Sequence, residues 1–280
     1  MTERAAERTP GTHTEELSAR PDGTEAFYTP LGEGRFRSER HTSGPWDPQA
    51  QHFGPPSALL MRSLQQLAPP QQGTLARITV EILGPVGLGE LAISAQVLRP
   101  GRSVRLLRAE LRSSDRLCAT ANAWQIANTD TAAIAAGQAE PPPGPAGLAE
   151  WTGDSNWGGG YLNAIQWRSA HGGFGLPGPA VVWARPRLPL VAGEVSSPLQ
   201  RLMLVADSGN GLSAELNPRE WYFINSELTV HLHRVPQGEW IALDAAMLTG
   251  SHGVGTARTV LHDRTGQVGS GAQALLLRRR

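Results

Sequence analysis

One carboxylate stands where the sequence changes from an apolar run to a glycine-rich stretch. Asp207 follows the apolar residues of "LMLVA" and is followed by "SGNG". A carboxylate held beside a cleft can take a proton from water and so make that water a nucleophile. A carboxylate at such a break can also simply end a helix, with Gly209 in the left-handed conformation that closes many helices. Both interpretations of Asp207 stay open at this point.

Three histidines and one cysteine are the other residues that could do chemistry. His52 and Gly54, in "QHFGPP", come at the expected start of a helix, where backbone N–H groups could face a carbonyl or a phosphate. A capping or solvent-facing histidine is the alternative. His231 and His233 alternate on one strand face, but no third ligand is spaced to join them, so no metal site is predicted. Cys118, the sole cysteine, lies in the alternating run "RLCATANAW" and is interpreted as a core residue.

The composition excludes several classes of function. All 25 basic residues are arginine, so a Walker-type phosphate loop and a lysine Schiff base are both excluded. The 25 acidic residues bring the net charge to zero, which predicts no nucleic-acid partner. The Gly-x-Gly of "GVGTARTVLHD" continues a strand pattern, and no G-x-S-x-G elbow is present, so neither a nucleotide loop nor a serine hydrolase is expected.

The sequence carries neither the pattern of a membrane span nor that of a secretory signal. No stretch reaches 18 uninterrupted apolar residues, and no apolar segment follows the charges at the start, so we expect a cytoplasmic protein without a membrane partner. The three arginines at 278–280 are expected to form a frayed, solvated tail.

The elements that must position these residues fall into two blocks. Residues 1–22 are polar and lack periodicity, which predicts a disordered tail. Residues 128–158 are rich in Ala, Pro and Gly and predict a linker. The two blocks are therefore an N-terminal one over 23–127 and a C-terminal one over 159–280.

Both blocks follow the same plan of an extended segment, one helix and several alternating strands. Proline marks the start of each helix, and Ser197 is the expected N-cap of the second. The extended segments are 34–41 and 180–190, the helices 55–67 and 197–207, and the strand regions 74–126 and 226–277.

The strand regions superpose without a gap at an offset of 150 residues. Eight positions in about 49 are identical, and the turns and apolar faces coincide as well, which indicates an internal duplication. Neither a helix nor a sheet can bury its apolar face alone, so the fold class is predicted as α+β, with each sheet wrapped around one central helix. The identical positions are Thr79/Thr229, Val80/Val230, Ala92/Ala242, Ala95/Ala245, Leu98/Leu248, Val104/Val254, Arg108/Arg258 and Leu111/Leu261.

At this level of detail the chain resembles the acyl-CoA thioesterase II (medium-chain acyl-CoA thioesterase) family and its actinobacterial relatives. The resemblance rests in the second block on "PLQRLMLVADSGNGLS", "PREWYFINSELTVHLHR", "GEWIALDA" and "GVGTARTVLHDRTGQVGSGAQALL". In the first block "HFGPPSALLMRSL" and "RITVEILGPVGLGEL" fit the same family. It covers roughly residues 25–277 and implies a double hotdog fold, that is, two tandem helix-in-sheet halves.

The resemblance also implies an activity and a site. The activity is hydrolysis of an acyl thioester of coenzyme A or an acyl carrier, with no metal, cofactor or covalent intermediate. The attacking water would be held by Asp207, by Gln273 of "GSGAQALL" and by Asn225 of "FINSELTV". Asn225 stands where the family has Ser or Thr; an amide can bond a water but cannot be a nucleophile. Thr229 is a nearby hydroxyl for the substrate, although its counterpart Thr79 suggests a structural role.

The duplication bears on how many sites the chain has. The gapless offset puts Ser57 opposite Asp207 and Ala123 opposite Gln273. The carboxylate and the amide have no counterpart of their kind in the first copy, which favours a single working site, in the second block. Two alternatives stay open: a protein that binds acyl thioesters or small apolar ligands without catalysis, and a hotdog enzyme for a biosynthetic dehydration or cyclisation. A homo-oligomer formed through the sheets also stays open.

Overall fold

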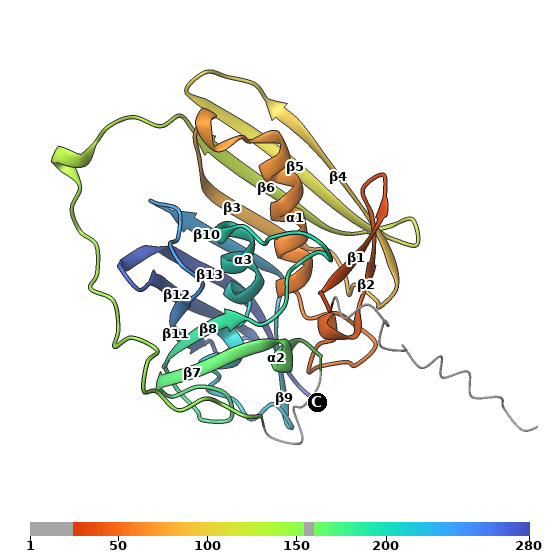
Figure 1. Cartoon of the computed structure of the whole chain (residues 1–280). Coiled ribbons are helices and arrows are strands. Elements are labelled where there is room, and N and C mark those ends of the chain that lie inside the picture. Colours follow the sequence, from red (N-terminus) through yellow and green to blue (C-terminus); the bar gives the residue numbers. More distant parts are fainter. Residues whose placement is uncertain (1–24, 154–159) are drawn as a thin grey trace, which may run out of the picture.

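The computed structural model describes residues 25–153 and 160–280, so the expected tail over 1–22 lies outside the described residues. Two blocks of strands follow one another along the chain, each with a helix against one face (Figure 1). The first block contains β1 (Tyr28–Gly32), β2 (Arg35–Ser38), α1 (Gly54–Leu67), β3 (Thr74–Ile82), β4 (Glu90–Arg99), β5 (Val104–Ser113) and β6 (Arg116–Ile126). The second contains α2 (Gly160–Ala164), β7 (Ile165–His171), β8 (Ala180–Pro186), α3 (Pro198–Ala206), α4 (Gly209–Leu212), β9 (Trp221–Asn225), β10 (Glu227–Leu232), β11 (Ile241–Thr249), β12 (Val254–Asp263) and β13 (Gly266–Arg279).

Within the described residues, the strands form one continuous antiparallel sheet. Its order is β1-β2-β4-β5-β6-β3-β10-β13-β12-β11-β8-β7, and β9 pairs with β13 off this path. The second half of this order reverses the first, because β3 corresponds to β10, β6 to β13, β5 to β12 and β4 to β11. The two blocks are therefore joined edge to edge through β3 and β10.

The strand registers confirm the 150-residue repeat. Strands β5 and β12 begin and end 150 positions apart. Leu107 pairs with Ala123 between β5 and β6, and Ala257 pairs with Gln273 between β12 and β13. Gln273 is thus the structural counterpart of Ala123, as the offset predicts.

Both helices form where the sequence predicts them. α1 carries prolines in its first turn, whose missing N–H groups need no partner there. α3 begins with a capping box in which Ser197 accepts from the Gln200 N–H and the Gln200 side chain accepts from the Ser197 N–H.

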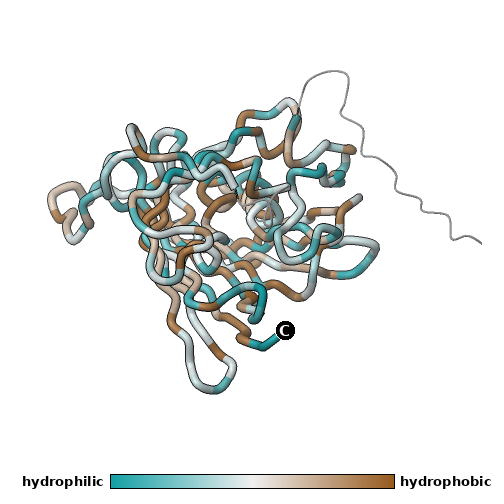
Figure 2. Tube along the Cα trace, turned by 90° about the horizontal axis from the view of Figure 1, so that it is seen from below, coloured by the Kyte–Doolittle hydropathy of each residue, from teal (hydrophilic) through white to brown (hydrophobic). Residues whose placement is uncertain are grey.

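The two helices lie side by side on the same face of the sheet (Figure 1). A side chain on Gly54 would put its Cβ 2.1 Å from the Leu204 carbonyl oxygen, so glycine allows the start of α1 to approach α3 closely. Leu59 and Leu64 of α1 and Leu202 and Met203 of α3 belong to one buried cluster. Apolar segments accordingly run through the middle of the molecule, and both halves share one core (Figure 2).

The expected role of Gly209 as a left-handed helix cap is wrong. Gly209 is the first residue of the short helix α4, and its φ is not positive. Its Cβ would lie 2.5 Å from the Thr259 hydroxyl oxygen and 3.1 Å from Gln273 Oε1. Glycine is required here because the chain passes close to β12 and β13.

The pairing of Ser57 with Asp207 is also wrong. The helices start at Gly54 and Pro198, 144 positions apart, whereas the strands keep an offset of 150. Six additional residues therefore lie between helix and strands in the second block. Counted from the helix start, the counterpart of Asp207 is Ser63, whose hydroxyl donates to the Leu59 carbonyl.

The arginines at the end of the sequence do not form the frayed tail that we expected. β13 extends to Arg279, and the Arg280 N–H donates to the Glu220 carbonyl. The Arg280 guanidinium lies 4.3 Å from the centre of the Tyr222 ring. Cation–π contact with an aromatic residue of β9 therefore holds these residues in place.

Little regular structure joins the two blocks. Between Ile126 and Gly160 the described residues contain one 3-10 turn (Ala132–Ile134) and one isolated bridge, Glu150 with Arg168. The helices of the described chain are all too short or too polar to cross a membrane.

Candidate active site

Asp207 lies at the break between α3 and α4 and is almost completely buried, with 4% of its surface exposed. Its backbone keeps the right-handed helical conformation, so the chain turns from one helix straight into the next. The break holds the carboxylate between the two helices and the inner face of the sheet.

Two side-chain amides from the sheet converge on this carboxylate. Asn225, at the end of β9, donates from Nδ2 to Asp207 Oδ1 over 2.8 Å and to the Glu227 carbonyl over 3.2 Å. Gln273 of β13 donates from Nε2 to the Asp207 carbonyl over 3.0 Å and lies 3.4 Å from Oδ1. The three residues that the resemblance selects are therefore in contact, although 66 residues separate Gln273 from Asp207.

The amide of Gln273 is fully used by the protein. Its Oε1 accepts from the Asn210 N–H in α4 over 3.1 Å, while its Nε2 bonds to Asp207. Asn210 in turn donates from Nδ2 to the Phe223 carbonyl of β9. Gln273 thus fixes the α3–α4 break against the sheet. Its contact with Asn210 was not predicted from the sequence.

The start of α1 brings the first block to the same carboxylate. The Phe53 N–H donates to Asp207, and Nδ1 of His52 lies 3.4 Å from Asp207 Oδ2. The Gly54 N–H donates to His52 Nδ1 over 3.0 Å. These N–H groups, which we expected to face a substrate, are therefore bonded to the protein here, and prolines 55 and 56 supply none.

An aromatic residue outside both predicted helices supports the site from the other side. Tyr161 of α2 stacks on His52, with ring centres 3.8 Å apart and planes 8° apart. Its hydroxyl donates to the Leu204 carbonyl and lies 2.8 Å from the Ser208 hydroxyl. Sequence reasoning missed Tyr161, because nothing in its local pattern distinguishes it from a buried core tyrosine.

Burial is the largest influence on the pKa values of Asp207 and His52. It raises the pKa of Asp207 to about 6, although hydrogen bonds from Asn225, Gln273 and Phe53 act in the opposite direction. Burial also lowers the pKa of His52 to about 3. The imidazole is therefore neutral at pH 7, and its contact with Asp207 is not an ion pair.

Thr229 does not join the site. Its hydroxyl donates to Glu227 over 2.9 Å and lies 3.1 Å from the Thr79 hydroxyl. Leu228 and Val230 on either side of it are fully buried, so the Thr229 side chain points to the opposite face of the sheet. The structural role suggested by its counterpart Thr79 is the one that the contacts support.

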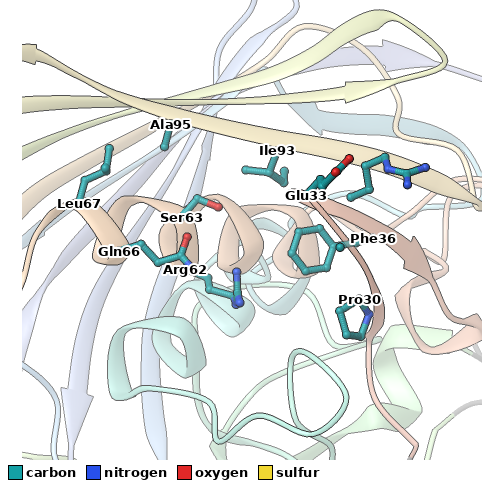
Figure 3. A pocket seen from close by; sticks show the side chains of 12 residues that line it. Pro30, Glu33, Phe36, Arg62, Ser63, Gln66, Leu67, Ile93 and Ala95 are labelled. Atoms are coloured by element: carbon teal, nitrogen blue, oxygen red, sulfur yellow. The ribbon is translucent and has the colours of Figure 1, made fainter.

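Three cavities lie in other parts of the described chain. One cavity of about 330 Å³ lies between α1 and the strands β1, β2 and β4, with Arg62, Ser63 and Phe36 on its walls (Figure 3). One of about 350 Å³ lies beside Gly211 and Phe223. The third, about 450 Å³, is lined by Trp151, Trp167, Phe174 and other residues of the β7–β8 edge.

The third cavity is lined by aromatic residues from the segment 150–167, which contains three tryptophans. Trp151 and Trp167 line it, and Phe174 packs 5.0 Å from each of their ring centres. Trp157 lies outside the described residues. Trp167 is 6.1 Å from Tyr161, so aromatic rings connect this cavity to His52 and Asp207.

No group of three or more metal-ligating side chains occurs within the residues that the structure describes. His231 and His233 are exposed on β10 and just beyond it, and His233 bonds to the Gln267 carbonyl. At the site itself a buried carboxylate is held by two amides beside a neutral imidazole.

Two family models match consecutive parts of the chain. The acyl-CoA thioesterase N-terminal domain matches residues 42–126, and the acyl-CoA thioesterase C-terminal domain matches residues 138–277. No curated protein sequence matches the chain.

Solved structures share the fold at low sequence identity. A protein from Thermobifida fusca described as a thioesterase II has a TM-score of 0.69 and 18% identity, over 90% of this chain and 95% of the other. A hot dog fold protein of unknown function from Alicyclobacillus acidocaldarius gives 0.68 and 14%, over 89% and 95%. Acyl-CoA thioesterase II TesB2 from Mycobacterium marinum gives 0.62 and 14%, over 90% and 95%.

These similarities agree with the two helix-in-sheet halves and confirm the α+β double hotdog fold. Together the two family models cover most of the chain, including α1 of the first block and Asp207, Asn225 and Gln273 of the second. The chain belongs to the acyl-CoA thioesterase family.

Proposed function

We propose that the protein hydrolyses acyl thioesters of coenzyme A, or of an acyl carrier, with a water molecule that Asp207 deprotonates. The observation that carries this proposal is the convergence of Asn225 and Gln273 on one buried carboxylate at the α3–α4 break. Membership of the acyl-CoA thioesterase family supports the substrate class.

The pKa of Asp207 suits this role. At about 6 it leaves the carboxylate largely ionised at pH 7, yet makes it a stronger base than an exposed aspartate. Both amides direct N–H groups toward Oδ1, and we assign Oδ2, the oxygen that faces His52, as the one that takes the proton.

The reaction needs no covalent intermediate. A water O–H bond breaks, its proton moves to Asp207, and the water oxygen bonds to the thioester carbonyl carbon while the C=O π pair moves to the carbonyl oxygen as an oxyanion. The tetrahedral intermediate then collapses, the C–S bond breaks, and the leaving thiolate takes the proton from Asp207. Asn225 cannot be a nucleophile; in this proposal it holds the carboxylate in place.

The test uses purified protein and a panel of acyl-CoAs, from short to long chains and aromatic acids, with a thiol-reactive dye as readout. We expect thiol release from part of the panel, and a loss of about 10²- to 10⁴-fold in Asp207→Asn, as for other general bases. Asp244→Asn, an exposed aspartate of β11, is the matched control and should keep full activity. An acyl-carrier protein loaded with the same acyl group forms a second arm.

The outcomes separate the candidate functions. Absence of thiol release from every acyl-CoA and acyl-carrier substrate would contradict the proposal. If acyl ligands then raise the melting temperature without thiol release, the protein binds them without catalysis. Full activity of Asp207→Asn would refute the assigned base.

A further inference from the structure

His52 lies against the oxygen of Asp207 that takes the proton, and this relationship goes beyond the proposed function while resting on it. Its Nδ1 is 3.4 Å from Asp207 Oδ2, and the two side chains are only 12% and 5% exposed. With the imidazole neutral and Asp207 ionised, two atoms with lone pairs face each other, which is unfavourable. The contact becomes favourable once Asp207 carries a proton.

The backbone determines which nitrogen of His52 faces the carboxylate. The Gly54 N–H donates to Nδ1, so Nδ1 is an acceptor and the hydrogen of the neutral ring is on Nε2. The stack on Tyr161 holds the plane of the ring, and the Tyr161 hydroxyl is tied to the α3–α4 break through Leu204 and Ser208. The single in-plane lone pair on Nδ1 therefore accepts from the Gly54 N–H and also faces Asp207, so a hydrogen bond from Asp207 shares this lone pair with Gly54.

We propose that His52 is a positioning residue that accepts a hydrogen bond from protonated Asp207 and so holds the catalytic proton between the two steps of hydrolysis. The proton leaves water, rests on Oδ2 with its hydrogen bond to Nδ1, and passes to the leaving thiolate when the C–S bond breaks. His52 takes no proton itself and remains neutral throughout.

The charges around the pair agree with this role. A hydrogen bond that only the neutral form of an acid can make raises the pKa of that acid. Burial also raises the pKa of Asp207, so the two effects act in the same direction. Tyr161 of α2 is the other titratable side chain against the pair, and burial raises its pKa well above the ordinary value, so it stays neutral. Asn225 and Gln273, from β9 and β13, are uncharged amides, and the start of α1 contributes the Phe53 N–H.

Two substitutions distinguish the effect of the Nδ1 acceptor from the effect of the aromatic ring. His52→Phe keeps an aromatic ring over Tyr161 but removes the acceptor. His52→Asn keeps an acceptor oxygen near the place of Nδ1 but removes the ring. In His52→Phe we expect the acid limb of the kcat/KM profile to move about one pH unit lower, with a roughly tenfold lower kcat. In His52→Asn the limb should stay where it is in the wild type.

A second measurement does not depend on turnover. The infrared band of the protonated Asp207 carboxyl, identified by its loss in Asp207→Asn, reports the titration of this group directly. Its midpoint should fall in His52→Phe and not in His52→Asn. If His52→Phe does not fold, His52→Gln takes its place, because the Gln amide oxygen reaches the place of Nε2 and leaves no acceptor at the place of Nδ1. The midpoint should then fall in His52→Gln, as expected for His52→Phe.

The two proposals can fail independently. A wild-type protein that releases no thiol contradicts the proposed function, while the infrared titration still tests the pair. Unchanged midpoints in His52→Phe and His52→Gln would overturn the role of His52. Equal shifts in His52→Phe and His52→Asn would also overturn it, because the ring and not the acceptor would then be responsible.

Discussion

Thr79 and Thr229 occupy the same position in the two copies of the repeat, and they face each other across β3 and β10 with their hydroxyl oxygens 3.1 Å apart. When two equivalent residues of an antiparallel pair are direct partners, an approximate twofold axis passes between them. This axis relates the two blocks and places α1 beside α3.

The same axis explains why the molecule has one candidate site and not two. At one end of the helix pair, the start of α1 meets Asp207 through Phe53 and His52. At the other end, the start of α3 meets Gln65 of α1, which accepts from Ser197 and Gln200. At that end the contact between the helices is thus made by a neutral amide and not by a carboxylate.

Removing the charge of Asp207 should stabilise the protein. Its pKa is about 6 in the folded chain, against 3.8 for an ordinary aspartate, so the folded state favours the protonated acid. Stability is therefore lost as the pH rises from about 4 to about 6, by roughly 3 kcal/mol for this group. Asp207→Asn should exceed the wild type in urea unfolding at pH 8 by an amount of this order and match it at pH 4. A difference that does not change with pH would contradict the buried, shifted carboxyl.

Asn225 should control the basicity of Asp207 in the direction opposite to His52. Its hydrogen bond is the strongest influence that lowers the pKa of Asp207, so Asn225→Ala should move the acid limb of kcat/KM to higher pH. We expect a loss of about 10- to 100-fold in kcat/KM at pH 7, because a charge-assisted hydrogen bond to the base is lost. Asn225→Ser, with the hydroxyl that the family pattern carries, should recover part of this loss. Equal, wild-type profiles for both variants would show that Asn225 does not hold the base.

Gln273→Ala should reduce both stability and activity, whereas a comparable glutamine should affect stability alone. Gln273→Ala leaves the buried Asn210 N–H and the Asp207 carbonyl without these partners, at a cost of about 1–3 kcal/mol. Gln125 of β6 is equally buried and bonds to the Pro69 and Gly73 carbonyls. Gln125→Ala should lose similar stability in urea but retain kcat. Parallel losses of kcat in both variants would mean that destabilisation alone explains the effect of Gln273.

Gly209→Ala should disturb the site through space and not through the backbone. The new Cβ would meet the Thr259 hydroxyl at 2.5 Å and Gln273 Oε1 at 3.1 Å, so we expect about 1–3 kcal/mol of destabilisation and a lower kcat. Adding Thr259→Ala removes the closest contact and should restore part of both. Gly211→Ala, whose nearest neighbour is Phe174 at 3.5 Å, is the control and should stay near wild type. If Gly209→Ala has no effect, the close packing of α4 against β12 and β13 is wrong.

Sequence patterns alone predicted much of this fold, because the features involved are local. The proline-led helix at 55–67, the Ser197 cap and the 150-residue repeat of the strands all follow from residue spacing, and all three are present. The resemblance added Asp207, Asn225 and Gln273, which the structure brings into contact.

The tertiary structure alone decided what surrounds the carboxylate. His52 reaches Asp207 from a distant part of the chain, and Tyr161 reaches the neighbouring Ser208. Thr229 points to the other face of the sheet, and Gly209 serves close packing. Local sequence cannot encode these outcomes, since they depend on how β3 and β10 join the two halves. That junction brings the start of α1 to the end of α3, and the burial that results is what raises the pKa of Asp207.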